Sequence, residues 1–259
     1  KPYSFLSGDN FPTNAEEADI ALRSVYGVMQ TYYDMNEGNY SGYDFDMFKY
    51  TFAAIVNEVS DLQQPYYIST GQYRGNVYYK APFACFYKGI NFANNLIAAL
   101  EKRDATTETW IPAKVAEAKA ARAYYYFWLV RLFSDVPLVL EPTTSSKFEG
   151  TRTPVPEIYN QIMEDLKAAE DMLPDVANAD GRITKGGCKA ILAEVYVTMA
   201  GWRRTPDGQN VEGDASYWAL ARDKAKEVLD MGTYTFASDY TQIFKDLALD
   251  VYNPEMIFD

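Results

Sequence analysis

A tyrosine-rich segment, residues 60–82, holds the side chains best suited to contact a ligand. It sustains neither a helical nor a strand period, and prolines and glycines interrupt it repeatedly. The sequence therefore predicts a long loop, and loops of this length in compact domains are usually functional or disordered. Because the aromatic content is unlike that of a disordered segment, we expect some of these rings to form ligand contacts. The alternative is that they only pin the loop to the helices beneath it.

The absence of histidine limits the chemistry available to the chain. Histidine is the commonest general base and metal ligand, so Ser/His and Cys/His triads and zinc catalysis are excluded. A glycosidase needs only two suitably spaced carboxyl groups, and Asp44 with Asp46 or Glu58 with Asp61 are candidate pairs. Acidic residues number 36 in this chain, so solvated surface positions explain these pairs better. We expect no enzyme activity, no metal site and no cofactor.

The charge balance constrains ligands and partners. A formal net charge of −12 disfavours binding to nucleic-acid phosphates and to anionic lipid headgroups. The ligand is therefore expected to be neutral or cationic. No stretch approaches the length of a membrane-spanning helix, and the chain starts at Lys1 without an initiator methionine. These features favour a piece of a longer, processed protein.

Apolar residues recur at helical spacing through most of the chain, which predicts a mainly α fold. Thr13 with Glu16 forms the pattern of a capping box, Thr184 is placed to cap a later helix, and Gly232 to close the last one. Successive helix pairs of similar length favour a tetratricopeptide-like α/α superhelix with long irregular loops. The expected helical faces span residues 18–29, 45–59, 83–97, 118–132, 158–173, 190–200 and 217–229.

Two further segments have weaker patterns. Residues 201–215 are rich in glycine and charge and predict a linker, with a turn at Asp207 and Gly208. Residues 256–258 look like the beginning of a strand.

The stretch 113–138 is expected to form the central helix. Pro112 suits the first turn, where its missing N–H costs no intrahelical bond. Alanines in the first half allow close helix packing, bulky aromatic residues fill the second half, and Pro137 helps to end the helix. Arg122 on this helix is predicted to matter more for folding than for binding. Asn94, on the apolar face of the preceding helix, is predicted to make a structural hydrogen bond.

Only two cysteines are present, Cys85 and Cys188, and each lies in a helical pattern. This spacing makes a disulfide framework improbable. We expect both to be buried free thiols.

Five segments, in order, carry a resemblance to a known family. The most specific contains Glu117, Arg122-Ala123, Tyr125-Tyr126-Phe127, Leu129, Phe133 and Asp135-Val136-Pro137-Leu138. A segment before it contains Tyr87, Ile90 and Asn94, and segments after it contain Arg152, Pro154, Tyr159, Ile162, Asp165-Leu166, Ala169 and Leu173-Pro174; Gly181-Arg182, Thr184-Lys185, Ala190, Leu192-Ala193 and Tyr196; and Trp218, Ala221, Ala225, Gly232, Tyr234, Ile243-Phe244, Asn253, Glu255 and Phe258. Together they resemble the SusD/RagB family of outer-membrane nutrient-binding lipoproteins. The main departures are Phe83, Ala120-Ala121 and Ser134, which stand where the family often has Trp, larger apolar residues and Gly.

The resemblance implies a surface-exposed lipoprotein of the outer membrane, attached through an N-terminal lipid anchor that this chain does not contain. Such proteins capture oligosaccharides, or in some members peptides, and deliver them to a SusC-like TonB-dependent transporter. They carry out no covalent chemistry. Residues 1–259 are then expected to be a single SusD-like helical region, without the loop- and strand-rich C-terminal half of the family. A less favoured alternative is a tetratricopeptide-like adaptor that binds proteins.

Glycan capture fits the composition of segment 60–82. Sugars present apolar C–H faces that stack on aromatic rings, and hydroxyl groups that need hydrogen-bond donors and acceptors. The candidate glycan-binding residues are Asp61, Tyr66, Tyr67, Tyr73, Arg74, Asn76, Tyr78 and Tyr79.

Overall fold

The computed structural model describes residues 11–29, 32–33, 45–46, 77–143, 150–176, 181–205, 207–248 and 255–258. Its helices are α1 (Ala15–Gly27), α4 (Val77–Glu101), α5 (Ile111–Phe133), α6 (Val155–Glu170), α7 (Lys185–Ala200), α8 (Tyr217–Asp230) and α9 (Tyr240–Ala248). Its strands are two short antiparallel pairs, β1 (Tyr32–Tyr33) with β2 (Phe45–Asp46) and β3 (Arg203–Arg204) with β4 (Asn210–Val211).

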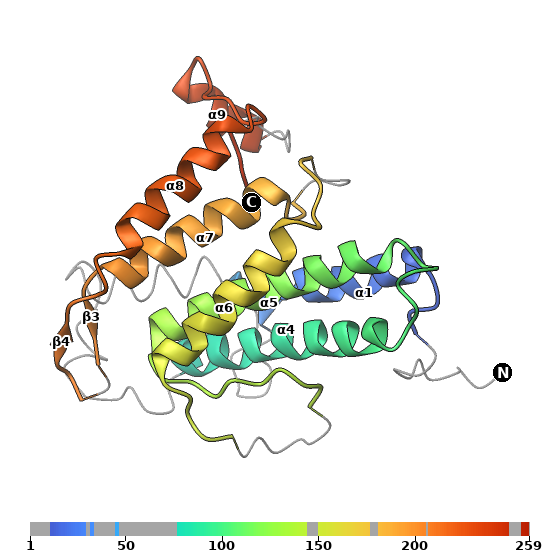
Figure 1. The fold of residues 1–259 in the computed structure, drawn as a ribbon, viewed down its shortest axis with the longest axis horizontal. Helices are drawn as coiled ribbons and strands as arrows, with labels where there is room; N and C mark the ends of the chain where they lie inside the picture. The colour runs from blue at the N-terminus through green and yellow to red at the C-terminus, as the bar shows by residue number, and fades with distance from the viewer. Residues whose placement is uncertain are drawn as a thin grey trace.

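The described helices from α1 to α8 form an array in which neighbours along the chain pack side by side. Helices α1, α4 and α5 lie close to parallel, α6 crosses them, and α7 and α8 continue outward (Figure 1). Helix α5 packs against α4 and α6 and also contacts α1 and α7, so it is central to the array. The predicted mainly α fold of packed helix pairs is confirmed.

Helix α5 is central because its sequence allows neighbours to approach on every side. Pro112 lies in its first turn as predicted. The alanines of its first half, from Ala116 to Ala123, are almost completely buried, which permits short distances between helix axes. In its second half Tyr125, Tyr126 and Phe127 are fully buried and supply the bulk of the core. Burial on all faces explains why an amphipathic stripe is a poor description of this helix.

A buried ion-pair cluster joins α1 and the start of α7 to α5. The Glu117 carboxylate accepts hydrogen bonds from Arg182 Nε at 2.5 Å and Nη2 at 2.6 Å, and from the Tyr26 hydroxyl at 2.8 Å. Arg182 also donates to Asp19 at 2.6 Å. Although burial opposes its charge, the hydrogen bonds to Glu117 and Asp19 raise the pKa of Arg182. The cluster therefore joins α5 to α1 and fixes the position of α1.

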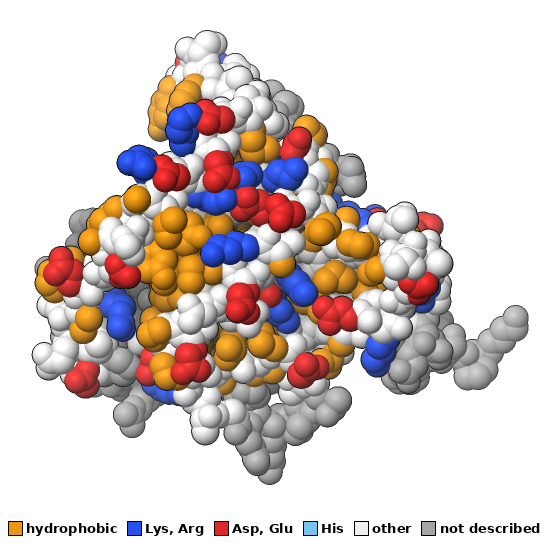
Figure 2. All heavy atoms as spheres, viewed as in Figure 1, with side chains coloured by type: hydrophobic (Ala, Val, Ile, Leu, Met, Phe, Trp, Pro, Cys, Tyr) orange, Lys and Arg blue, Asp and Glu red, His pale blue; other side chains and the backbone are white. Residues whose placement is uncertain are grey.

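A second charge cluster crosses from α6 to α8. Lys189 on α7 and Lys224 on α8 share the carboxylates of Glu170 and Glu227. Figure 2 shows basic and acidic side chains gathered over α7 and α8. Hydrogen bonds from Lys189 and Lys224 lower the pKa of Glu227. These contacts hold α8 to the array, because its only buried apolar side chains are Ala221 and Val228.

Both cysteines are buried free thiols, as predicted. Burial raises the pKa of each thiol. The Cys85 thiol donates to the Val28 carbonyl at 3.6 Å, which connects α4 to the end of α1.

Several predicted boundaries are wrong by short distances. The N-cap of α1 is Asn14, whose side chain accepts from Glu17 N, so the predicted capping pair of Thr13 and Glu16 is displaced by one residue. Glu17 instead accepts from Thr13 through its side chain. Thr184 does cap α7, and Gly232 does adopt a left-handed conformation after α8.

Other elements differ in type or exposure. The helix predicted over residues 45–59 begins in strand β2, and residues 47–59 lie outside the described part of the chain. Residues 256–258 form no strand, and the predicted linker 201–215 contains the β3–β4 hairpin. Val197 and Leu229, which belong to the apolar helical patterns of the sequence, are 45% and 70% exposed.

Candidate functional site

The structure locates only part of the predicted ligand-binding segment. Tyr78 and Tyr79 lie in the first turn of α4, which begins at Val77. The prediction of a loop extending to Pro82 is therefore wrong for its last six residues, 77–82. Pro82 is the sixth residue of α4, where it has no N–H to donate to an intrahelical hydrogen bond. The other predicted site residues, Asp61, Tyr66, Tyr67, Tyr73, Arg74 and Asn76, lie outside the described residues.

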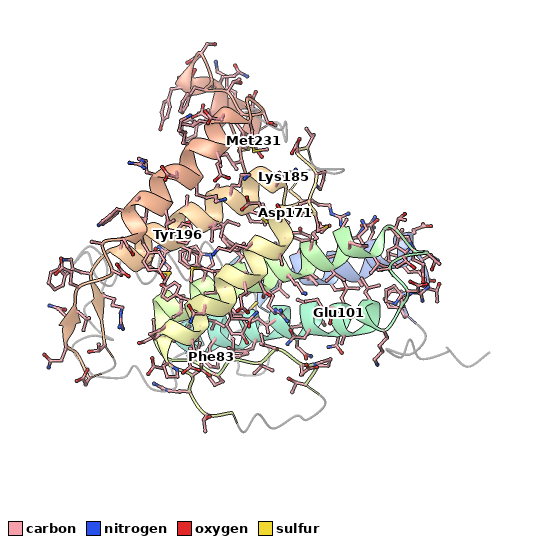
Figure 3. All side chains as sticks on the ribbon, viewed as in Figure 1. Phe83, Glu101, Asp171, Lys185, Tyr196 and Met231 are labelled. Carbon is pink, nitrogen blue, oxygen red and sulfur yellow. The ribbon has the colours of Figure 1, made fainter. Side chains whose placement is uncertain are left out.

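Aromatic packing fixes the end of α4 from which this segment departs. Phe83, labelled in Figure 3, packs edge-on against Phe133 at the end of α5, with 5.3 Å between ring centroids. Its ring is also 4.7 Å from that of Tyr87, one turn further along α4. Phe83 is a smaller ring than the family's usual Trp, and these contacts show that it still fills the junction. These ring contacts attach α4 at Phe83, its seventh residue, to the end of α5.

The exit turn after α5, residues 134–141, is held by side chains from two helices. The Tyr87 hydroxyl donates to the Pro137 carbonyl at 2.5 Å, and the Tyr126 hydroxyl bonds to both the N–H and the carbonyl of Val139. Burial raises the pKa of Tyr87 and of Tyr126 well above the usual tyrosine value, so both remain neutral donors. The turn cannot shift without breaking buried hydrogen bonds.

The same turn also starts the next helix. Asp135 Oδ1 accepts from Val155 N at 3.1 Å, which satisfies a free N–H at the beginning of α6. Val136 pairs with Thr153 in an isolated β-bridge. The Asp135-Val136-Pro137 motif therefore ends one helix and caps another, which gives a physical reason for this residue pattern.

Arg122 is the charged residue that connects these parts. Its guanidinium forms two parallel hydrogen bonds of 2.8 Å to the Asp165 carboxylate of α6. It also donates to Asn94 Oδ1 at 2.8 Å, and Asn94 Nδ2 donates to the carbonyls of Val139 and Glu141 at 3.0 and 3.2 Å. Arg122, Asp165 and Asn94 are at most 5% exposed. The predicted structural hydrogen bond of Asn94 is confirmed.

Ser134 adopts a backbone conformation that glycine favours. Its φ and ψ angles are 61° and −126°, a region that residues with a Cβ rarely enter. Its buried Oγ has no hydrogen-bond partner among the described residues. The sequence contains a signal for this strain. Ser134 stands where the SusD/RagB family, which the sequence resembles, commonly has glycine, and glycine adopts such backbone angles without strain.

The described carboxyl groups with displaced pKa values all shift in the same direction. Among the described carboxyl groups whose pKa is displaced, each pKa is lowered, by hydrogen bonds or ion pairs; an example is Asp214 beside Ser216. A catalytic acid would need a raised pKa. Within the described part of the chain, no group of three or more Asp, Glu or Cys residues is placed to hold a metal ion. No described helix is both long enough and apolar enough to cross a lipid bilayer.

Comparisons with known proteins identify the family to which this array of helix pairs belongs. A family model described as "Starch-binding associating with outer membrane" matches residues 8–197. The chain therefore belongs to this SusD-like family.

Relatives by sequence agree with this assignment. A SusD-like protein of Bacteroides ovatus is 29% identical over 165 residues, which are 62% of this chain and 29% of that protein. SusD-like protein P2 of Formosa agariphila is 32% identical over 102 residues, 39% of this chain and 20% of that protein. The matched regions thus cover less than a third of these relatives.

Solved structures share the fold. A laminarin-binding SusD-like protein is 26% identical, with a TM-score of 0.64 over 95% of this chain and 51% of that one. A SusD homologue from Bacteroides thetaiotaomicron has a TM-score of 0.68 over 96% of this chain and 46% of that one, at 24% identity. This chain therefore corresponds to about half of these structures.

We predict that Arg122→Ala destabilises the protein by about 3 to 5 kcal/mol, because it leaves the Asp165 carboxylate buried without its partner. The free energy of unfolding from urea denaturation measures this. Lys226→Ala is the matched control, since the Lys226–Asp230 pair is exposed and contributes about 0.5 kcal/mol or less. If Arg122→Ala kept the wild-type melting temperature but lost glycan affinity, a binding role would replace the structural one.

We predict that Ser134→Gly stabilises the protein by about 1 kcal/mol. The substitution relieves the backbone strain and removes an unpaired hydroxyl, and these gains exceed the added chain entropy of glycine in the unfolded state. Ser134→Ala removes only the hydroxyl, so it should give a smaller gain in the same denaturation experiment. A stability gain for Ala equal to that for Gly would show that backbone strain is unimportant here.

Proposed function

We propose that this protein is a surface glycan-binding protein that captures oligosaccharides. The observation that carries the proposal is the family-model match over residues 8–197. The laminarin-binding relative, which is 26% identical and matches 95% of this chain, supports it. The net charge of −12 favours a neutral glycan over one rich in carboxylate or sulfate groups.

We place the ligand contacts on the segment that leads into α4. Its rings and polar side chains can stack on sugar faces and bond to sugar hydroxyls. The residues proposed are Asp61, Tyr66, Tyr67, Tyr73, Arg74, Asn76, Tyr78 and Tyr79. The packing of Phe83 on Phe133 supports this placement, because it attaches α4 to α5 close to this segment, which lowers the ordering cost of binding.

The proposed biological role is delivery of the captured glycan to a SusC-like TonB-dependent transporter. In this proposal the protein is a lipoprotein on the outer face of the outer membrane, attached through an N-terminal lipid anchor, and its helical array faces the transporter. The family description, which includes association with the outer membrane, supports this location. Capture of peptides in place of glycans is the alternative, since an aromatic and polar segment can also bind extended peptides.

Replacement of Tyr66, Tyr73 and Arg74 together by alanine is predicted to weaken glycan binding by about tenfold or more, because stacking and hydrogen-bonding groups are lost. Isothermal titration calorimetry with malto-, laminari- and xyloglucan-derived oligosaccharides measures the effect. Tyr240→Ala is the control, because Tyr240 is a 73% exposed tyrosine on the remote helix α9. The triple variant should unfold at the wild-type temperature.

An unchanged affinity in the triple variant would remove this segment from the site. Binding of a peptide pool with no binding of any of the oligosaccharides would favour the peptide alternative. Release of new reducing ends during incubation with these oligosaccharides would contradict a purely binding role.

A further inference from the structure

Helix α8 is held against α7 at both of its ends and along its middle. At its start, the Tyr217 ring stacks on that of Tyr196, with 5.7 Å between ring centroids. After its end, the Tyr234 and Thr184 hydroxyl groups are hydrogen-bonded at 2.9 Å, and a Cβ at Gly186 would collide with the Tyr234 ring. The second charge cluster, which crosses from α6 to α8, holds the middle. These contacts fix which side of α8 faces α7.

The two other sides of α8 differ in their chemistry. On one side the exposed residues are charged: Asp223, Lys226 and Asp230. On the other side lies a stripe of exposed apolar residues, Trp218, Ala225 and Leu229. Their spacings of seven and four residues place them along one side of the helix. Helix α8 therefore has one side suited to water and another suited to packing against protein.

None of the described helices covers the apolar stripe. Helices α5, α6 and α7 each pack against a neighbour on two sides, whereas α7 is the only described helix in extensive contact with α8. Helix α9, which follows α8 in the chain, does not pack along it within the described residues. The last element of a helical array needs a polar outer face to remain soluble. The apolar stripe does not meet this requirement.

The border of the stripe resembles the rim of a protein interface. Arg222 lies at its edge and forms an ion pair with the neighbouring Asp223 at 2.6 Å. Interfaces between folded units commonly have an apolar centre and a polar rim. The distribution of residues on α8 therefore favours a protein contact.

The lengths of related structures indicate what makes this contact. The laminarin-binding structure and the Bacteroides thetaiotaomicron structure match 95% and 96% of this chain, but only 51% and 46% of their own lengths. In each of these proteins a comparable length of polypeptide accompanies the helical array.

Residues 255–258 bring the chain back to the same end of α8. Phe258 packs edge-on against Tyr124 of α5, with 5.5 Å between ring centroids. Its Cβ also lies 3.6 Å from the position that a Cβ at Gly187 would take. Gly187 is the neighbour of Gly186, on which Tyr234 packs after α8. The chain therefore returns to the end of α8 at which the apolar stripe finishes.

We propose that the apolar stripe of Trp218, Ala225 and Leu229 is an internal interface of the complete gene product. Its cover is the part of the polypeptide that corresponds to the unmatched half of these relatives. This cover presents apolar side chains to the stripe and polar groups to its border at Arg222. The inference does not depend on the identity of the ligand.

The test is maleimide labelling of single-residue variants of the complete gene product, with each labelled peptide identified by mass spectrometry. The Leu229→Cys variant should react at least about tenfold more slowly than the Lys226→Cys variant, because labelling of a covered thiol requires local opening. Lys226→Cys is the matched control, since Lys226 is exposed on the charged side of the same helix. Ala225→Cys changes the stripe least and should react as slowly as Leu229→Cys. Circular dichroism should show wild-type helix content in all three variants.

The outcomes distinguish the proposed cover from a second copy of the protein. Slow labelling at positions 225 and 229 that does not depend on protein concentration would support the internal interface. Labelling as fast as at position 226 would overturn it. Slow labelling that becomes fast on dilution would assign the stripe to a contact between two copies and would also overturn it.

Discussion

The buried pair of Arg122 and Asp165 is the interaction on which the rest of the structure depends. A guanidinium with 5% exposure is costly to bury unless its donors find partners. Those partners are the Asp165 carboxylate of α6, Asn94 on α4 and the Leu140 carbonyl of the exit turn. The hydrogen bonds that compensate the buried charge of Arg122 therefore fix the relative positions of α4, α5, α6 and the exit turn after α5. Glu117 has the same effect on the opposite side, where Arg182 and Tyr26 join α5 to α1.

This constraint has a consequence for binding. The buried charged side chains Arg122, Asp165 and Glu117 form ion pairs and hydrogen bonds that hold the helices together. The proposed ligand contacts are therefore placed on other residues, in surface segments outside these buried clusters. Phe83 and Tyr87 tie α4 to α5 and its exit turn. In the proposed account, the scaffold and the ligand contacts are thus made of different residues.

The sequence predicts the helices best where local signals and burial agree. Pro112 and Pro137 delimit α5 because proline acts on the backbone directly. The sequence does not reveal strand β2 at Phe45, because this strand pairs with the distant Tyr33. It does not reveal the β3–β4 hairpin either, because strands of two residues show no periodicity. Val197 and Leu229 have helical spacing but are exposed, since spacing alone does not say which apolar faces are covered. The composition of segment 60–82 indicated a site, but only Tyr78 and Tyr79 of that site lie among the described residues.

Hydrogen–deuterium exchange on the complete gene product, with and without a saturating oligosaccharide, tests the central claim most directly. The claim is that a fixed helical framework presents a ligand-binding segment that is separate from it. The account predicts that the ligand slows exchange in residues 60–79 and leaves exchange unchanged around Arg122 and Glu117 in α5. Slower exchange in α5 around these two residues, with no change in residues 60–79, would contradict it.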